Sequence, residues 1–228
     1  MPSVRVERVP VETWNLGRLG FDHLQLVFRS DVDASGSRQE DWFVIEGLRE
    51  AEGHDVRVAV EGWHGGTTLS EANGGLTGEA LVARIGTPEG RGSREVADSG
   101  GAVELWATLV SYAADIETQK FPYIALALPG SPLPTVNSSS LVSSLLYHAG
   151  LGMDEALPAG LRFSPGTRTL LGTSADETLA TGEGFSVVLA GAGDDRLFGR
   201  DELGAVDKLF GGRGDDTIHW SKGFDIVH

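Results

Sequence analysis

Cysteine is absent from the 228-residue chain, and long apolar runs are absent as well. Without cysteine the chain has no disulfide, no zinc–thiolate site and no cysteine nucleophile. No stretch approaches the roughly 20 apolar residues that a membrane-spanning helix needs. The N-terminal sequence MPSVRVERVPVETW lacks the apolar core of a secretory signal peptide. The sequence therefore predicts neither a transmembrane segment nor export by a cleaved N-terminal signal.

Positive charge is also scarce, with 18 Lys and Arg residues against 33 Asp and Glu residues and a net charge of −15. This balance argues against binding to nucleic acids or anionic membranes through bulk electrostatics. Hydrophobic residues make up 40% of the chain, which is ordinary for a globular protein. The length allows one large domain or two small ones.

Glycine and aspartate gather in the last quarter of the chain, where residues 172–228 divide into six nonapeptides. The insert Gly199-Arg200-Asp201 interrupts this register once. The copy GGRGDDTIH at 211–219 fits the pattern G-G-x-G-x-D-x-U-x, with U a large aliphatic residue, which indicates a calcium-binding parallel β-roll. A flexible Gly/Asp-rich linker is the alternative, but the aliphatic eighth position favours the roll. That position holds Leu179, Val188, Leu197, Leu209, Ile218 and Val227.

Two nonapeptides make one coil, so alternate turns stack on the same edge of the predicted roll. The first edge contains the turns that begin at Gly172, Ala190 and Gly211. The second edge has fewer glycines and contains the turns that begin at Thr181 and Glu202, followed by Trp220. Tight turns need residues that tolerate positive φ, and we therefore expect calcium on the first edge, best between the Ala190 and Gly211 turns. The second edge is expected to be weak or empty.

Backbone carbonyl and carboxylate oxygens are the ligands that calcium prefers. The sixth position of each nonapeptide supplies the carboxylate, and the glycine-rich positions supply carbonyl oxygens. Asp194 and Asp215, at the fifth position, are expected to point toward solvent. The predicted calcium ligands are Gly172, Ser174, Glu177, Ala190, Gly191, Ala192, Gly193, Asp195, Gly212, Gly214 and Asp216. The corresponding sixth positions of the second edge are Ser186, Asp207 and Asp225.

Residues 172–228 resemble the RTX, or hemolysin-type, calcium-binding repeats of secreted bacterial proteins. The resemblance implies a roll that folds when it meets extracellular calcium, and export through a type I secretion apparatus. That route normally needs a C-terminal signal beyond the repeats. The chain ends on the last residue of a nonapeptide, so one interpretation is that the native protein continues beyond His228.

The upstream residues predict an α+β domain over 1–165, with a linker at 166–171 before the all-β roll. Strands are expected at 4–9, 22–28, 41–47, 56–60 and 81–85, in a mixed or antiparallel sheet. Loops are expected at 30–40, 61–78 and 87–101. An apolar stripe from Val103 to Ile116 indicates one helix. A second helix is expected to begin at Asn137 or Ser138, run through LVSSLLYHAGL and stop at Gly150.

The common catalytic signatures are missing, including G-x-S-x-G, H-E-x-x-H and the P-loop. One constellation remains: a histidine on an early strand precedes a helix that opens with Asn137-Ser138-Ser139-Ser140-Leu141-Val142. This order resembles the circularly permuted NlpC/P60 papain-like families, with serine in place of their nucleophilic cysteine. The resemblance implies Ser138 as nucleophile, His23 as base and Glu46 as the residue that orients the base. A hydroxyl is much less acidic than a thiol, which weakens this assignment.

Three interpretations of the upstream domain stay open: a binding or catalytically eroded module, a serine hydrolase or amidase acting on an amide or ester, and an unrelated α+β domain. Each candidate residue also has a structural interpretation. His23 can be a half-buried strand residue, and Ser138 can cap its helix. His148, in the last turn of the same helix, suits the helix dipole without any other role. Trp63 can be a buried turn residue or a stacking platform in a groove.

Overall fold

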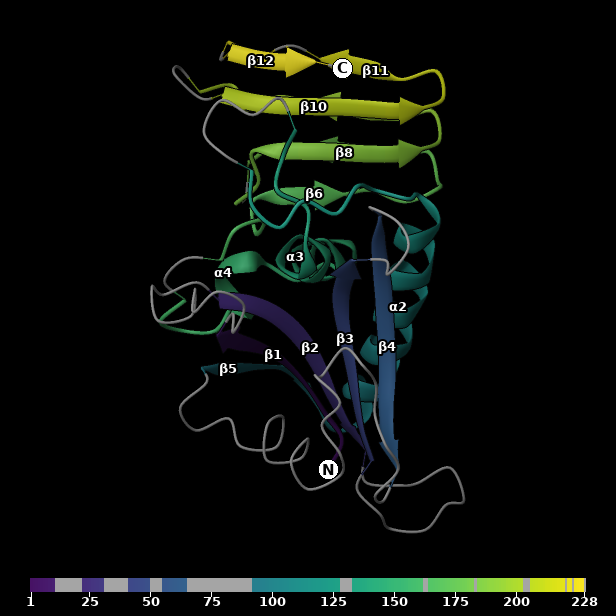
Figure 1. The fold of residues 1–228 in the computed structure, drawn as a ribbon, viewed down its shortest axis with the longest axis vertical. Coiled ribbons are helices and arrows are strands. Elements are labelled where there is room, and N and C mark those ends of the chain that lie inside the picture. Colours follow the sequence, from purple (N-terminus) through teal and green to yellow (C-terminus); the bar gives the residue numbers. More distant parts are fainter. Residues whose placement is uncertain are drawn as a thin grey trace.

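The computed structural model describes residues 1–10, 22–30, 41–49, 55–64, 92–127, 133–161, 164–182, 184–202, 206–219, 221–222 and 224–227. An α+β domain occupies the N-terminal part, and a roll of parallel strands follows it (Figure 1). None of the described helices is long and apolar enough to cross a membrane.

The N-terminal domain is built on a five-stranded antiparallel sheet in the order β4-β3-β2-β1-β5. Four predicted strands are confirmed, while the one expected at 81–85 lies outside the described residues. Residues 61–64 extend β4, although the sequence predicted that the turn-rich segment begins at Glu61. The strands are β1 (Ser3–Pro10), β2 (Asp22–Ser30), β3 (Asp41–Arg49), β4 (Val56–His64) and β5 (Ser93–Asp98).

Two long helices lie between the sheet and the roll, namely α2 (Ser99–Thr118) and α3 (Ser138–His148). A single turn, α4 (Met153–Ala156), follows them. The prediction of a loop over 87–101 is wrong for its last part, which contains β5 and the start of α2. The segment SREVAD of β5 is short and polar, and it becomes a strand because it pairs with the edge of β1.

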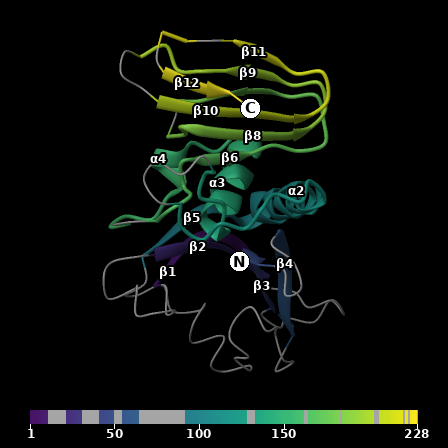
Figure 2. The same ribbon diagram turned by 45° about the horizontal axis from the view of Figure 1, so that its top comes forward.

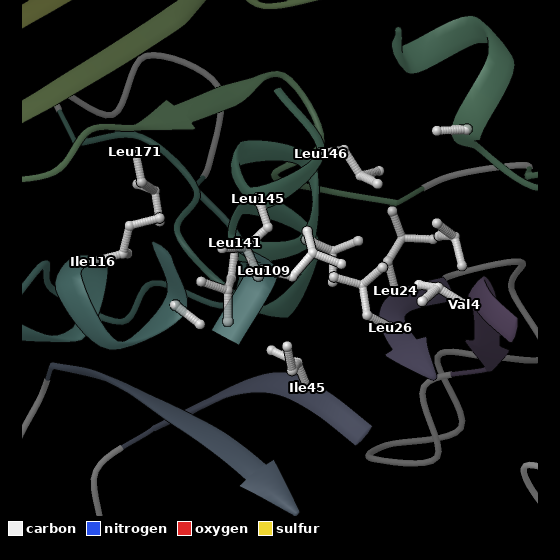
Figure 3. Packing of buried hydrophobic residues seen from close by; sticks show 14 of the residues in the cluster. Val4, Leu24, Leu26, Ile45, Leu109, Ile116, Leu141, Leu145, Leu146 and Leu171 are labelled. Carbon is white, nitrogen blue, oxygen red and sulfur yellow. The ribbon is translucent and has the colours of Figure 1, made fainter. Parts of the chain in front are cut away.

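The main core lies where the sheet, the two helices and the first strand of the roll meet (Figure 3). Leu26 and Ile45 project from the sheet toward Leu109 of α2 and Leu145 of α3, and all four are fully buried. The expected apolar stripe of the first helix is confirmed for Trp106, Leu109, Ala113 and Ile116. It is wrong for Val103, which is 55% exposed because it lies on the solvent side of α2.

The roll consists of two parallel sheets, β12-β10-β8-β6 and β11-β9-β7. Its strands are stacked in layers, with β6 nearest to α3 and β12 farthest away (Figure 1), and Figure 2 shows the second sheet alongside the first. The strands are β6 (Thr169–Leu171), β7 (Thr178–Ala180), β8 (Val187–Ala192), β9 (Arg196–Phe198), β10 (Val206–Arg213), β11 (Thr217–His219) and β12 (Phe224–Val227).

The aliphatic eighth positions form the interior of the roll wherever the structure describes their side chains, as the register predicted, and the side chain of Val227 lies outside the described residues. Leu179, Val188, Leu197 and Leu209 are buried in one apolar cluster, and Ile218 packs against it. The roll begins earlier than residue 172, because β6 lies within the segment predicted as a linker. Leu170, nine residues before Leu179, fills the same inward position.

Candidate metal centre

The turns of the first edge, 172–177, 190–195 and 211–216, stack so closely that glycine is required at several positions. Gly193 and Gly214 have φ values of +123° and +136°, a backbone conformation that residues with side chains rarely adopt. A Cβ atom at Gly214 would overlap the carbonyl oxygen of Gly193. A Cβ at Gly193 would lie 2.5 Å from the carbonyl oxygen of Ala175. The glycine pattern therefore lets each turn approach the next.

Oxygen atoms from both sides enter the gaps between these turns. The carbonyl oxygens of Gly191 and Gly193 face the turn that follows, close to Gly212 and Gly214. The sixth-position carboxylates reach back to the turn that precedes them. The backbone N–H of Glu177 donates to Asp195 Oδ1 at 2.8 Å, and that of Asp195 donates to Asp216 Oδ1 at 3.0 Å.

Asp195 is the most deeply buried acidic residue of the first edge. The residue is 1% exposed, and its Oδ2 atom has no hydrogen-bond partner among the described residues. The pKa of its carboxyl is raised from 3.8 to about 6, mainly by burial and in addition by the charges of Asp216, Glu177 and Asp176, while the hydrogen bond from the backbone of Glu177 opposes the rise. A buried anionic oxygen without a partner, surrounded by other carboxylates, fits a hard cation such as calcium.

All of the predicted calcium ligands lie in these three turns. Within the part of the chain that the structure describes, no group of three or more His, Asp or Glu side chains could hold a metal ion. The predicted ligand set, which consists mainly of glycine and alanine carbonyl oxygens, does not depend on such a side-chain group and stays a prediction.

The fifth-position aspartates are exposed, as expected, but Asp194 also has a structural role. Its backbone N–H donates to Asp176 Oδ1 at 2.8 Å, and its own Oδ1 accepts the backbone N–H of Asp215 at 2.9 Å. These bonds form a ladder along the outside of the first edge. The expectation that these groups only face solvent is thus incomplete for Asp194.

The second edge is organised differently around Asp207, whose side chain is completely buried. Its carboxylate accepts hydrogen bonds from Thr181 Oγ1 at 2.8 Å, from the backbone N–H of Arg200 at 2.8 Å and from Arg200 Nη2 at 3.3 Å. The other two sixth positions of this edge are Ser186 and Asp225, and the side chain of Asp225 lies outside the described residues.

His148 connects α3 to the first turn of the roll through a hydrogen bond and an ion pair. His148 Nε2 is 2.8 Å from the carbonyl oxygen of Leu171, and Nδ1 is 3.4 Å from Glu177 Oε1. Glu177 Oε2 accepts the backbone N–H of Thr173 at 2.6 Å. The interpretation of His148 as a residue without any role beyond the helix dipole is therefore wrong. It binds the N-terminal domain to the edge that carries the candidate metal centre.

Ser138 lies at the start of α3, where it bridges two strands of the sheet. Its hydroxyl donates to the carbonyl oxygen of Leu24 in β2 at 2.6 Å and accepts the backbone N–H of Gly47 in β3 at 3.1 Å. The residue is 5% exposed. A Cβ on Gly47 would lie 3.1 Å from the Cα of Ser138, so this glycine lets the helix approach the sheet.

The structure brings His23 and Glu46 together, with 3.9 Å between His23 Nε2 and Glu46 Oε2. Successive side chains of a strand point to opposite faces. Leu24 is buried in the core beneath α3, so its neighbour His23 projects from the other face of the sheet. Ser138 is on the α3 side. The structure therefore places His23 beside Glu46, on the face of the sheet opposite to Ser138.

Asn137, rather than Ser138, is the N-cap of α3. Its side-chain oxygen accepts the backbone N–H groups of Ser139 and Ser140, and its own N–H is donated to Ser140 Oγ at 3.2 Å. Sequence reasoning missed that the serines after the cap tie the helix to the rest of the protein. Ser144 Oγ, for example, accepts the backbone N–H of Leu171 in β6 at 2.8 Å. A run of serines on the buried face of a helix is the signal that could have indicated this.

Stacked glycine turns, short parallel strands and inward aliphatic residues define the C-terminal part as a parallel β-roll of the metal-binding type. Residues 171–201 and 204–227 match the family model of the RTX calcium-binding nonapeptide repeat, in four copies. These residues are RTX repeats, and RTX nonapeptide repeats bind Ca²⁺. No curated protein and no solved structure matches the chain.

Proposed function

We propose that the first edge of the roll binds calcium between its stacked turns, and that the bound ions make the roll a calcium-triggered folding module. The observation that carries this proposal is the buried carboxylate of Asp195, with its unpartnered Oδ2 atom and its raised pKa. Calcium removes the cost of burying that charge, because it supplies the positive partner that the described protein groups do not.

A calcium titration of the chelated protein tests this proposal. We expect calcium to increase the β-sheet signal in circular dichroism and to raise the melting temperature. The control is magnesium at the same concentrations, because magnesium is reluctant to lose its water and prefers a stricter octahedral site. Unchanged spectra and melting curves from micromolar to millimolar calcium would refute calcium binding by this edge.

We infer further that the chain belongs to a secreted bacterial protein that reaches the extracellular medium through a type I secretion apparatus. RTX repeats are typical of secreted bacterial proteins, and extracellular calcium then supplies the trigger for folding. The test is expression in a bacterial host with and without a type I transporter. Accumulation in the medium only when the transporter is present supports the route, and equal retention in the cells contradicts it.

For the N-terminal domain we propose a binding or catalytically eroded module that also supports the first coil of the roll. The hydroxyl of Ser138 is committed to the backbones of β2 and β3, which is a structural use of the residue. His148 and Ser144 connect the same helix to β6 and to the first turn of the roll. This domain thus presents an ordered surface on which the repeats stack.

The alternative is a Ser138/His23 hydrolase, favoured by the approach of His23 to Glu46. A fluorophosphonate probe distinguishes the two, since it labels only an activated serine. The module proposal expects no labelling of Ser138 in calcium-loaded protein, with a known serine hydrolase as the positive control. Labelling that disappears in Ser138→Ala would establish the hydrolase.

A further inference from the structure

The insert Gly199-Arg200-Asp201 lies between two nonapeptides, on the second edge of the roll. Its arginine reaches Asp207, the sixth residue of the nonapeptide that follows. The backbone N–H of Arg200 donates to Asp207 Oδ2, and its guanidinium donates to Oδ1. The insert therefore places a positive charge directly on a completely buried carboxylate.

Asp207 has the same repeat position as Asp195, yet the two carboxylates have opposite surroundings. Asp195 has acidic neighbours and one oxygen without a partner among the described residues. Both oxygens of Asp207 are bonded, and Oδ2 also accepts the hydroxyl of Thr181. Arginine keeps its charge at every physiological pH. The charge of the sixth position is thus balanced by the protein on the second edge and left unbalanced on the first.

We propose that the guanidinium of Arg200 balances the charge of Asp207 in the way that a calcium ion balances the charge of Asp195. The second edge therefore needs no calcium ion at this position, and Asp207 binds none. The comparison with Asp195 rests on the proposed function, whereas the contacts of Arg200 do not. A buried carboxylate requires a counter-charge, and a calcium ion could reach Asp207 only by displacing a guanidinium that already satisfies it.

The rest of the insert extends the same arrangement toward the surface. Asp201 Oδ1 accepts the backbone N–H of Lys222, and Asp201 Oδ2 pairs with Lys222 Nζ at 3.1 Å. These hydrogen bonds lower the pKa of Asp201. Arg200 Nε is also 3.4 Å from Glu202 Oε2. The insert therefore forms ion pairs both with the nonapeptide that follows it, through Arg200, and with the next layer of the second edge, through Asp201.

Hydrogen exchange in millimolar calcium, followed by mass spectrometry, tests the role of Arg200 in the folded roll. In Arg200→Gln we expect exchange in peptides covering 196–202 and 206–210 to become at least about tenfold faster, because Asp207 loses its counter-charge. Lys222→Gln is the matched control, because the ion pair of Lys222 is exposed. In that variant, exchange in the same peptides should change less than about threefold. Arg200→Lys should retain part of the protection, which covers the case in which Arg200→Gln does not fold.

The double variant Arg200→Gln/Asp207→Asn should recover most of the lost protection, because no buried charge remains. Calcium stoichiometry from isothermal titration completes the test. Asp207→Asn should leave the number of bound ions unchanged, whereas Asp195→Asn should lower it. Unchanged exchange in Arg200→Gln, or loss of an ion in Asp207→Asn, would overturn the proposal. If the wild-type protein binds no calcium, the proposed function fails, and the exchange comparison still decides the role of Arg200.

Discussion

Replacing Asp195 by asparagine should have opposite effects on the stability of the protein with and without calcium. Asparagine has nearly the same shape, and its Oδ1 atom can keep the hydrogen bond from the backbone N–H of Glu177. It removes the negative charge that burial and the neighbouring carboxylates disfavour. In chelator, Asp195→Asn should therefore be more stable than the wild type at neutral pH.

The size and pH dependence of this effect follow from the raised pKa. The unfolded carboxyl loses its proton near pH 4, whereas the folded one does so near pH 6. Between these values the unfolded state releases its proton first, so the calcium-free wild type loses stability as pH rises. A pKa raised from 3.8 to about 6 corresponds to at most about 3 kcal/mol. Because solvent screening reduces this value, we expect about 1–2 kcal/mol above pH 7 and almost none at pH 4.

Urea unfolding of both proteins at pH 4.5 and pH 8, in chelator and in millimolar calcium, measures this prediction. Calcium should reverse the order, since a ligand at 100 times its dissociation constant adds about 2.7 kcal/mol to the wild type, and the variant lacks the carboxylate. Asp215→Asn is the matched control, because that carboxylate is exposed. A calcium-free variant that is less stable than the wild type at pH 8, or a difference independent of pH, would refute the reasoning.

Two further substitutions test how the roll is assembled. Gly214→Ala should destabilise the protein by about 2–4 kcal/mol in thermal unfolding, because φ is +136° and a Cβ would overlap Gly193. Its control is Gly100→Ala in α2, where a Cβ meets nothing within 4 Å, so this variant should be neutral or slightly stabilising in the same assay. His148→Ala should cost about 1–3 kcal/mol and weaken calcium binding in a titration, because it frees the first turn from α3. The exposed His219 provides its control, and equal effects of His148→Ala and His219→Ala would contradict this role.

The sequence by itself determined the roll, because a nonapeptide repeat is a local signal in which each position has a single physical requirement. Glycine is needed where φ is positive, and an aliphatic residue is needed where the short strand faces inward. The same logic located Asp195 and Asp216 on the edge that is richer in glycine. It also predicted four of the strands and a cap of α3 at Asn137 or Ser138, of which the structure selects Asn137, since alternation and capping are local patterns as well.

Contacts between distant segments decided the rest. β5 and the first layer of the roll exist because they pair with β1 and β8, and no local pattern shows such partners. The place of Ser138 between two strands depends on how α3 docks on the sheet. The charge balance of the two edges also needed the fold, because only the folded chain shows that Arg200 reaches Asp207 while Asp195 stays among carboxylates. A repeat register gives the position of each carboxylate, and its electrostatic partner depends on tertiary structure.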